Sequence, residues 1–392
     1  MANGFGTNAL KPGALIQSDP ISDAAQAVKS ELVKIGFRYS LEQNIMMAAE
    51  SNRVQGDPVT SAYAHDFFGN WTIFEADEFG GTCGWLTYKA TGASGLGVNL
   101  DEQSIRSNIG AVVSPNNNYH GVEYAIEQCA WAQSFIDGEF VFMIGQVNQT
   151  NYLDINRYAN SSHGQFVNSA LVNSMVIPAP GNNLGVNLQW QPTDGFYMML
   201  GVGPNNQGPG DNPWREVSAD NVSYCSEFGF IFKDVCGLGQ GVYRIQPFLA
   251  TANGDAGGGV AFNLEQQLGS RSPLGVFARA GFGDNATAKV PGAVKTQVST
   301  GIALLSPFIE REDRDYFAQA NNDFAGVGFV WTQPAVGPGQ FHSDEYALEF
   351  TCAFQLTATA TLQPDLQFVW DPINNPDGGP STVFQLQLNI AW

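Results

Sequence analysis

Apolar and polar side chains alternate along the last segment of the chain. Large apolar residues occupy every second position over residues 384–392, and amides or alanine fill the positions between them. A strand with one face in lipid and the other in water shows this two-residue period and needs about 9–11 residues to cross a membrane. Strands of soluble sandwiches also alternate, but rarely over about ten residues with amides along one face. The segment Val383–Trp392 therefore predicts a membrane strand of a β-barrel.

The same pattern recurs along most of the sequence, between turns rich in Gly, Pro, Asn and Asp. We count about sixteen such segments, an even number, as single-chain bacterial barrels have. They are residues 36–49, 69–80, 83–91, 121–135, 138–147, 183–194, 195–204, 222–234, 240–251, 257–268, 272–283, 294–305, 323–332, 345–359, 361–371 and 382–392. The predicted fold class is all-β, a transmembrane antiparallel β-barrel of about 16 strands with a short N-terminal helix.

The predicted joins between strands differ in length on the two sides of the barrel. Joins after odd-numbered strands are mostly long; they are 50–68, 92–120, 148–182, 205–221, 284–293, 333–344 and 372–381. Joins after even-numbered strands are mostly short, as at Gly81-Thr82 and at Gly269–Arg271. Because outer-membrane barrels have short periplasmic turns and long external loops, both termini are predicted to be periplasmic. Residues 306–322 form a long exception on the periplasmic side, and nothing in the sequence explains it.

Residues 20–35 stand apart, because their apolar residues have a helical spacing. We expect Ser22 to cap this helix at its start, followed by Asp23. The predicted organisation is a periplasmic segment over residues 1–35 and a barrel over residues 36–392. The helix either packs at the periplasmic mouth or enters the pore as a plug or gate.

Composition agrees with a surface that partly faces lipid. Only 14% of the residues are charged, whereas soluble proteins average about 25%. Aromatic residues make up 12%, and there are 44 glycines. No run of about 18 apolar residues predicts a transmembrane helix. Residues 1–14 have neither a basic nor an apolar leader region, so we expect the sequence to be a form without its cleaved signal peptide.

The formal net charge of −20 excludes nucleic acid as a natural partner, because phosphate binding requires basic patches. Acidic external loops suit divalent cations such as calcium or the repulsion of anions. No cofactor is expected. Five cysteines show no metal-binding spacing. Cys225 and Cys236 are either a disulfide formed in an oxidising periplasm or free thiols.

Enzyme signatures are scarce. The sequence contains no G-x-S-x-G elbow, H-E-x-x-H pair, P-loop or Rossmann fingerprint, so we do not expect an enzyme. The four histidines are isolated along the chain, which favours loop positions over ligand roles. The glycine-rich run 254–259 lacks a lysine and is interpreted as a tight external turn rather than a phosphate loop.

The join 148–182 is dense in hydrogen-bonding residues and is the third external loop. Its candidate binding residues are Asn148, Asp154, Asn156, Arg157 and Tyr158. Such groups at a constriction can replace the hydration of a polar solute. The alternative is an ordinary surface loop.

Two arginines lie in predicted strands among apolar and glycine neighbours. A charge on the lipid face costs roughly 2–4 kcal/mol near the midplane, so Arg244 and Arg279 should face the lumen. We expect them near Glu227, Glu265 and Glu349. Arginines beside carboxylates and aromatic rings suit sugar hydroxyls, because the guanidinium forms forked hydrogen bonds. The alternative is a structural ion pair that braces the barrel wall.

Four stretches resemble the OprB-like carbohydrate-selective porins. They are Gln133–Ser169, Gly241–Arg244, Gly275–Arg279 and the run from Glu349 through the Gln-Pro-Asp step to Pro372. The resemblance covers roughly residues 30–392, and the Gln-Pro-Asp run is its most specific part. Asn148 stands where this family often has aspartate. The resemblance implies a sixteen-stranded barrel that passes sugars or other small solutes by diffusion.

The leading hypothesis is an outer-membrane porin for small hydrophilic solutes, with carbohydrates among them. One alternative is a general or cation-preferring porin without sugar selectivity. Another is a structural or adhesive protein, either a barrel with a plugged lumen or a soluble all-β array. Expected partners are small solutes or sugars, outer-membrane lipid and the barrel-assembly machinery, which typically recognises a terminal aromatic such as Trp392. A homotrimer is common among porins and remains open here.

The lumen assignment of the two arginines is testable. Replacing Arg244 or Arg279 with alanine should change single-channel conductance or its block by sugars without unfolding the barrel. Unchanged channel properties in both variants would contradict the assignment.

Overall fold

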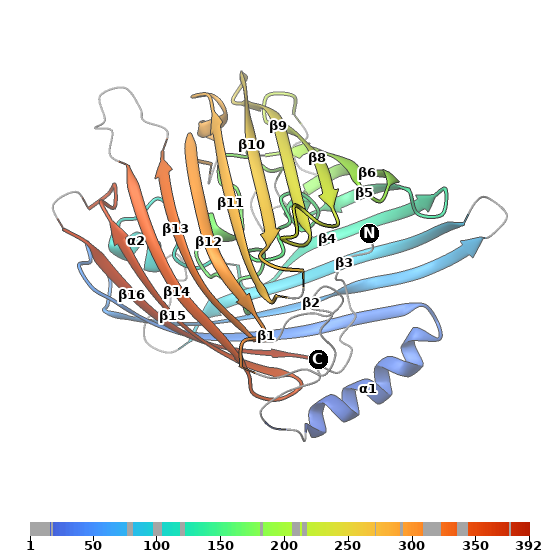
Figure 1. The fold of residues 1–392 in the computed structure, drawn as a ribbon, viewed down its shortest axis with the longest axis horizontal. Coiled ribbons are helices and arrows are strands. Elements are labelled where there is room, and N and C mark those ends of the chain that lie inside the picture. Colours follow the sequence, from blue (N-terminus) through green and yellow to red (C-terminus); the bar gives the residue numbers. More distant parts are fainter. Residues whose placement is uncertain are drawn as a thin grey trace.

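The computed structural model describes residues 16, 19–76, 81–96, 104–117, 122–180, 183–205, 212–213, 218–270, 272–290, 293–308, 323–334, 344–375 and 378–392. The strands of this described part close into one antiparallel barrel, shown in Figure 1. Each strand pairs with its neighbours in sequence, and β1 (Phe37–Glu50) pairs with β16 (Ser381–Ala391). The backbone of Leu41 exchanges hydrogen bonds of 2.8 and 3.0 Å with Trp392, which completes the closure.

The strands lie close to the predicted segments, and the predicted barrel and its strand number are confirmed. Between β1 and β16 the strands are β2 (Val59–Ala76), β3 (Thr82–Gly95), β4 (Ala125–Phe135), β5 (Phe140–Val147), β6 (Asn183–Thr193), β7 (Phe196–Pro204), β8 (Val222–Phe232), β9 (Gly241–Ala252), β10 (Asp255–Gln267), β11 (Leu274–Gly283), β12 (Thr296–Leu305), β13 (Phe324–Gln333), β14 (Glu345–Gln355) and β15 (Ala360–Trp370).

The alternation along β16 separates the two faces of the wall. Gln385 and Gln387 point inward and are fully buried, whereas Phe384 and Leu386 point outward and remain 47% and 37% exposed. The outward residues give the barrel an apolar outer surface, while the inward amides hydrogen-bond inside it. The predicted orientation of this strand is therefore correct.

Two local predictions were wrong, and a third lies largely outside the described residues. The strand β2 begins at Val59 rather than at residue 69, so the predicted join 50–68 shrinks to residues 51–58. The turn before β10 consists of Asn253 and Gly254, which both have positive φ angles, and residues 255–259 belong to β10 itself. The two-residue turn fits the twist of a β-hairpin better than a longer glycine loop. The exceptional join 306–322 lies largely outside the described residues.

Cys225 and Cys236 are both free, so the disulfide alternative is wrong. Cys225 is buried near the start of β8, and Cys236 lies in the turn beyond the end of that strand. The intervening strand residues extend the chain by about 3.3 Å each, which separates the two thiols far beyond bonding distance.

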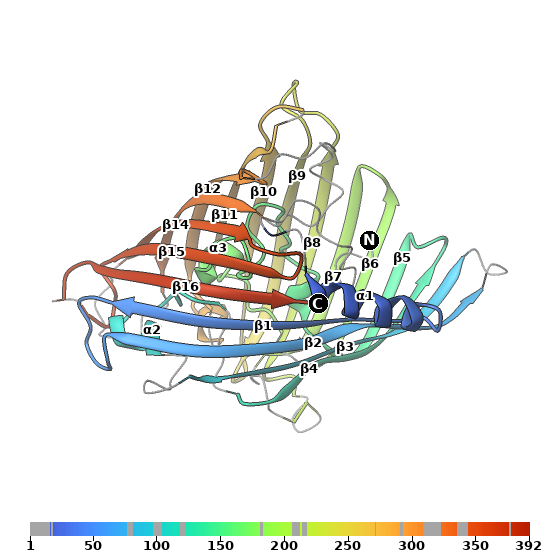
Figure 2. The ribbon, with the colours of Figure 1, turned by 90° about the horizontal axis from the view of Figure 1, so that it is seen from below.

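The helix α1 (Pro20–Val33) precedes the barrel, and Figure 2 shows it beside the first part of β1 and near the C terminus. Its cap is Asp19 rather than the predicted Ser22, because the Ser22 backbone N–H donates to the Asp19 carboxylate at 3.1 Å. Asp19 also accepts hydrogen bonds from the backbone N–H and the hydroxyl of Thr359, at 3.0 and 2.7 Å. One carboxylate thus caps α1 and fastens it to the turn between β14 and β15. Among the helices in the described ranges, none is long and apolar enough to span a bilayer.

Replacing Asp19 with alanine should release α1 from this turn. Burial raises the pKa of the carboxyl, but hydrogen bonds from Thr357, Thr359 and Ser22 outweigh that effect and lower it to about 2. Because this pKa lies below the ordinary value, the stabilisation is complete well above about pH 4 and declines as the pH falls from there through about 2. Amide protection of residues 20–33 should therefore be equal at about pH 7 and about pH 5.5, should weaken towards about pH 2, and should collapse in D19A.

The exposed Asp57 in the β1–β2 join provides the matched control, since D57A should leave protection unchanged. Full protection of α1 in D19A would show that the cap is not what holds the helix.

Candidate functional site

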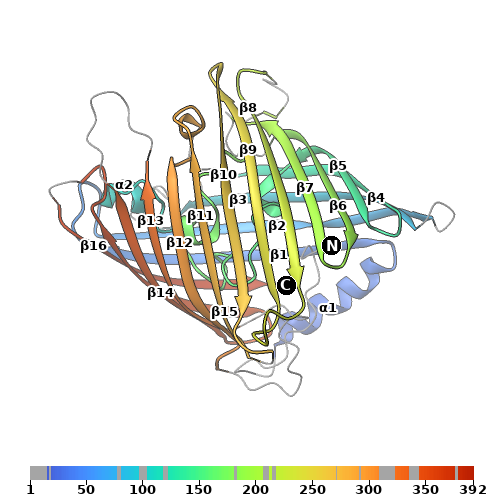
Figure 3. The ribbon, with the colours of Figure 1, turned by 45° about the horizontal axis from the view of Figure 1, so that its top comes forward.

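The segment that follows β5 turns into the barrel and runs along its inner wall (Figure 3). We call residues 148–180 the inward loop. It begins with a short 3-10 helix, Gln149–Asn151, whose first side chain accepts a hydrogen bond from Asn187 of β6 at 2.8 Å. Further along, the Asn168 amide donates to Gln367 of β15 at 3.1 Å. The loop therefore contacts the wall from β6 to β15, which favours the constriction loop over the alternative of an ordinary surface loop.

One buried ion pair holds the middle of the inward loop. Arg279 of β11 is fully buried, and its Nε donates to both carboxylate oxygens of Asp154 at 3.1 Å. The same guanidinium donates to the backbone carbonyls of Leu171 at 2.6 Å and of Asp154 and Ala159 at 2.9 Å. A planar group with several fixed donors can gather such a set of acceptors, whereas an ammonium cannot.

Glutamates of the wall accept hydrogen bonds from the backbone of the inward loop. Glu227 accepts from the N–H of Asp154 at 2.8 Å, and Glu265 accepts from the N–H of Arg157 at 2.6 Å. Glu349 accepts from the N–H groups of Val167 and Asn168 at 2.7 and 2.9 Å. Buried backbone donors need such partners, because an unpaired one costs about 1–3 kcal/mol.

Arg244 lies between two of these glutamates. Its guanidinium nitrogens are 3.6 Å from Glu227 and 3.4 Å from Glu265, and its Nε donates to the Tyr197 hydroxyl at 2.8 Å. Both predicted arginines thus face the lumen side of the wall. Arg244 meets the expected glutamates, whereas Arg279 pairs with Asp154 instead.

The candidate binding residues come together, but most of them face protein. Asn156 and Tyr158 are buried. The Asn156 amide donates a hydrogen bond to Asn263 at 2.7 Å. The Tyr158 ring packs on Gly275 so closely that any side chain at position 275 would clash with it. Asn148 caps the 3-10 helix at the start of the loop and is partly exposed. Buried side chains are Asp154, Asn156, Tyr158, Glu227, Arg244, Glu265, Arg279 and Glu349, while Arg157 is partly exposed. Their geometry is that of an anchor for the loop, and solute binding by them remains a prediction.

A second segment also folds inward, and the sequence analysis missed it. Residues 104–117 include the short helix α2 (Ser104–Ile109) and lie within the join predicted to be external. Glu345 accepts hydrogen bonds from the N–H groups of Val112 and Val113 at 2.7 and 3.0 Å, and Asn108 donates to Glu50 at 2.8 Å. No sequence motif marks this segment. The signal that could have indicated it is the presence of Glu50 and Glu345 at the ends of strands, where they accept its hydrogen bonds.

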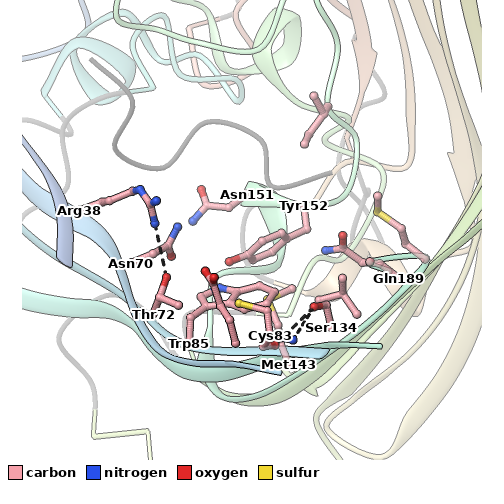
Figure 4. A pocket seen from close by; sticks show the side chains of 15 residues that line it. Arg38, Asn70, Thr72, Cys83, Trp85, Ser134, Met143, Asn151, Tyr152 and Gln189 are labelled. Carbon is pink, nitrogen blue, oxygen red and sulfur yellow. Dashed lines mark hydrogen bonds between the residues drawn. The ribbon is translucent and has the colours of Figure 1, made fainter. Parts of the chain in front are cut away.

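Within the described residues, an open cavity lies along the inner wall on the side of β1 to β7. A cavity of about 360 Å³ is lined by β1–β7 and by one side of the inward loop. Figure 4 shows Arg38, Asn70 and Thr72 on the wall facing Asn151 and Tyr152 from the loop. Trp85, Gln189 and other residues complete the lining. The cavity therefore offers amides, hydroxyls and an aromatic ring to a solute.

Charged groups gather beside this cavity, further along the same strands. Lys89 of β3 lies 3.2 Å from Asp66 and 2.8 Å from Glu127. The register of β3 and β4 shifts at Lys89, and both Glu127 and Gln128 are buried on the inward side as a result. His163 of the inward loop meets Glu42 of β1 at 3.1 Å. This contact joins the loop to β1, while Tyr152 of the same loop accepts a hydrogen bond from Gln128 of β4 at 2.7 Å.

Residues 239–392 match the family model described as "Carbohydrate-selective porin, OprB family". The predicted resemblance is confirmed over this part of the chain. The chain is also 28% identical over 118 residues to an uncharacterized protein of Aquifex aeolicus (strain VF5), which is 30% of this chain and 33% of that protein. The chain thus matches about a third of that relative's length.

Solved structures show the same fold. The high-pH structure of Pseudomonas putida OprB is similar with a TM-score of 0.69 and 17% identity, over 94% of this chain and 97% of that one. The low-pH structure of the same protein has a TM-score of 0.55 and 14% identity, over 99% of this chain and 100% of that one. A BenF-like porin from Pseudomonas fluorescens Pf-5 has a TM-score of 0.53 and 7% identity, over 90% of this chain and 97% of that one. The fold is that of an outer-membrane porin. The family match and the fold together support a channel for small solutes rather than an enzyme.

The buried arginine gives a test of the inward loop. Arg279→Ala removes the cationic partner of Asp154 and the guanidinium hydrogen bonds to three backbone carbonyls. Removing one partner of a buried ion pair costs about 3–5 kcal/mol. We expect the loop to detach while the barrel persists, so single-channel conductance should rise and become noisier. Hydrogen exchange should show lost protection over residues 148–180.

Arg38 provides the matched control, because it lines the open cavity and its guanidinium donates to the Thr72 hydroxyl of β2 at 3.4 Å rather than to the inward loop. R38A should keep the loop protected. An R279A protein with native conductance and native protection would rule out the anchor.

Proposed function

We propose that this chain is a porin of the bacterial outer membrane through which small hydrophilic solutes, carbohydrates among them, diffuse passively. The observation that carries the proposal is the division of the lumen. The inward loop is fastened to the wall from β6 to β15, and a cavity of about 360 Å³ remains between that loop and β1–β7. A barrel of this size leaves an aqueous path unless its interior is filled, and here it is narrowed on one side.

The cavity lining supports carbohydrates as solutes. Amide and hydroxyl groups of Asn70, Thr72 and Gln189 can exchange hydrogen bonds with sugar hydroxyls. The Trp85 ring offers an apolar face to the C–H side of a sugar ring. Such neutral contacts replace hydration without binding tightly, which a diffusion pore requires.

Charge supports a preference for cations in the same pore. The two wall arginines are neutralised by carboxylates and covered by the inward loop, so they add little positive potential to the path. Beside the cavity, Glu42, Asp66 and Glu127 outnumber Lys89. An excess of carboxylates at a narrow point attracts cations and repels anions. Neutral sugars and a cation preference are compatible in one channel.

The wider setting is part of the proposal. The outward apolar residues meet outer-membrane lipid, and the terminal Trp392 suits recognition by the barrel-assembly machinery. Calcium on acidic external loops and a homotrimer are further proposals, supported by the net charge of −20 and by the porin fold.

Planar-bilayer recording tests the function directly. Purified protein that shows heat-modifiable migration should open channels with a reversal potential that favours potassium over chloride. Liposomes that contain it should swell in isotonic hexose. A folded protein that opens no channel would leave only the plugged-barrel alternative, and a channel closed to hexoses would leave the cation-preferring one.

A further inference from the structure

Glu42 and Asp66 face each other across neighbouring strands on the inner wall. They are register partners in β1 and β2, and both are only partly buried. His163 reaches them from the inward loop, 121 residues along the chain from Glu42. Three separate elements therefore supply an imidazole and two carboxylates to one point beside the open lumen.

The three side chains have the spacing of metal ligands. One ligand atom from each lies within 4.8 Å of the other two. Ligands of a zinc ion lie about 2.0–2.2 Å from the metal, so closure requires side-chain movements on the order of 1 Å. The His163 ring nitrogen already lies 3.1 Å from the Glu42 carboxylate.

The tip of the loop is braced in a way that holds the imidazole in place. Gln165 accepts hydrogen bonds from the N–H groups of Asn160 and Ser161 at 2.8 and 3.2 Å. The Ser161 hydroxyl accepts one from the His163 N–H at 3.2 Å. A ligand on a braced turn loses less conformational freedom when it binds a metal.

The charged groups around the site favour the binding of a divalent cation. Glu42, Asp66 and Glu127 carry three negative charges, and Lys89 supplies one positive charge beside Asp66 and Glu127. Lys29 of α1 supplies a second positive charge that interacts with Glu42. With a neutral imidazole the carboxylates still outnumber the cations, so a divalent ion is attracted to the cluster.

We propose that Glu42, Asp66 and His163 bind a divalent transition-metal ion of the zinc class inside the lumen. Mixed imidazole and carboxylate donors favour such borderline ions over calcium or magnesium, which prefer oxygen ligands alone. Three protein ligands leave further positions for water. The bound ion links the tip of the inward loop to the opposite wall.

Lys89 sets the affinity of this site. Its ammonium lies 3.2 Å from Asp66 and competes with a metal for that carboxylate, but its shorter contact of 2.8 Å is to Glu127. Metal binding displaces Lys89 from Asp66 and leaves it paired with Glu127. The lysine thus weakens the site without abolishing it.

A bound ion also changes the path for solutes. It replaces a negative patch by a neutral one and occupies space between loop and wall. If the chain is the porin proposed above, zinc reduces both its conductance and its preference for cations. Metal binding itself does not depend on that function.

The test is calorimetric titration of the detergent-solubilised full chain with zinc chloride, followed by bilayer recording with and without zinc. The exposed Cys129 and Cys236 are first replaced by serine, because free thiols bind zinc. H163A and E42Q should each weaken binding by more than about tenfold, since even residues outside the ligand shell typically cost about 10–100-fold. K89M should tighten binding, because it removes the competing charge.

His65 supplies the matched control. It is adjacent to Asp66 in β2 but points to the outer face, where its ring stacks on Tyr63. H65A should bind zinc like the parent protein. Equal affinities of H163A and the parent, or weaker binding by K89M, would overturn the proposal.

The two proposals fail separately. Zinc binding by a protein that never conducts would contradict the porin and keep the metal site. An open channel that zinc neither binds nor blocks would contradict the site and keep the porin.

Discussion

The buried pair of Arg279 and Asp154 is the contact on which the shape of the lumen depends. The barrel wall needs no side-chain pair, since its backbone ladder is closed. The inward loop, in contrast, is held in position by side-chain contacts such as this ion pair. A single guanidinium binds the Asp154 carboxylate and three loop carbonyls, so it fixes two distant stretches of the loop relative to β11. Because the pair is wholly removed from water, neither group can be replaced alone without leaving a buried charge.

The glutamates of the wall solve a related problem for the loop backbone. An irregular segment inside a barrel carries N–H groups that no strand ladder satisfies. Glu349 takes two of these donors, and Glu345 takes two from the second inward segment. The oxygens of each carboxylate take these loop donors as partners in place of water. The acidic residues of this chain therefore belong in part to its architecture and not only to its surface.

The sequence predicted the strands well, because the outer surface and the interior of the barrel carry opposite chemistry on successive residues. The prediction of strand boundaries failed where the contrast between the apolar outer face and the polar inner face is weak. The first half of β2 places Ser61 and His65 on the outer face, which breaks the apolar repeat. The sequence also could not distinguish an arginine that binds a solute from one that anchors a loop, because the guanidinium donates the same hydrogen bonds in both roles. His163 looked isolated because its partners are far away in sequence and only the barrel brings them together.

The anchoring of the inward loop also determines when the lumen can take its shape. The loop leaves the wall after β5, but its partners lie in strands from β6 to β15. The loop can therefore dock only after those strands are in place, whatever the order in which the wall forms. Narrowing of the lumen follows completion of that wall, and a barrel whose loop is still undocked has a more open interior than the finished protein.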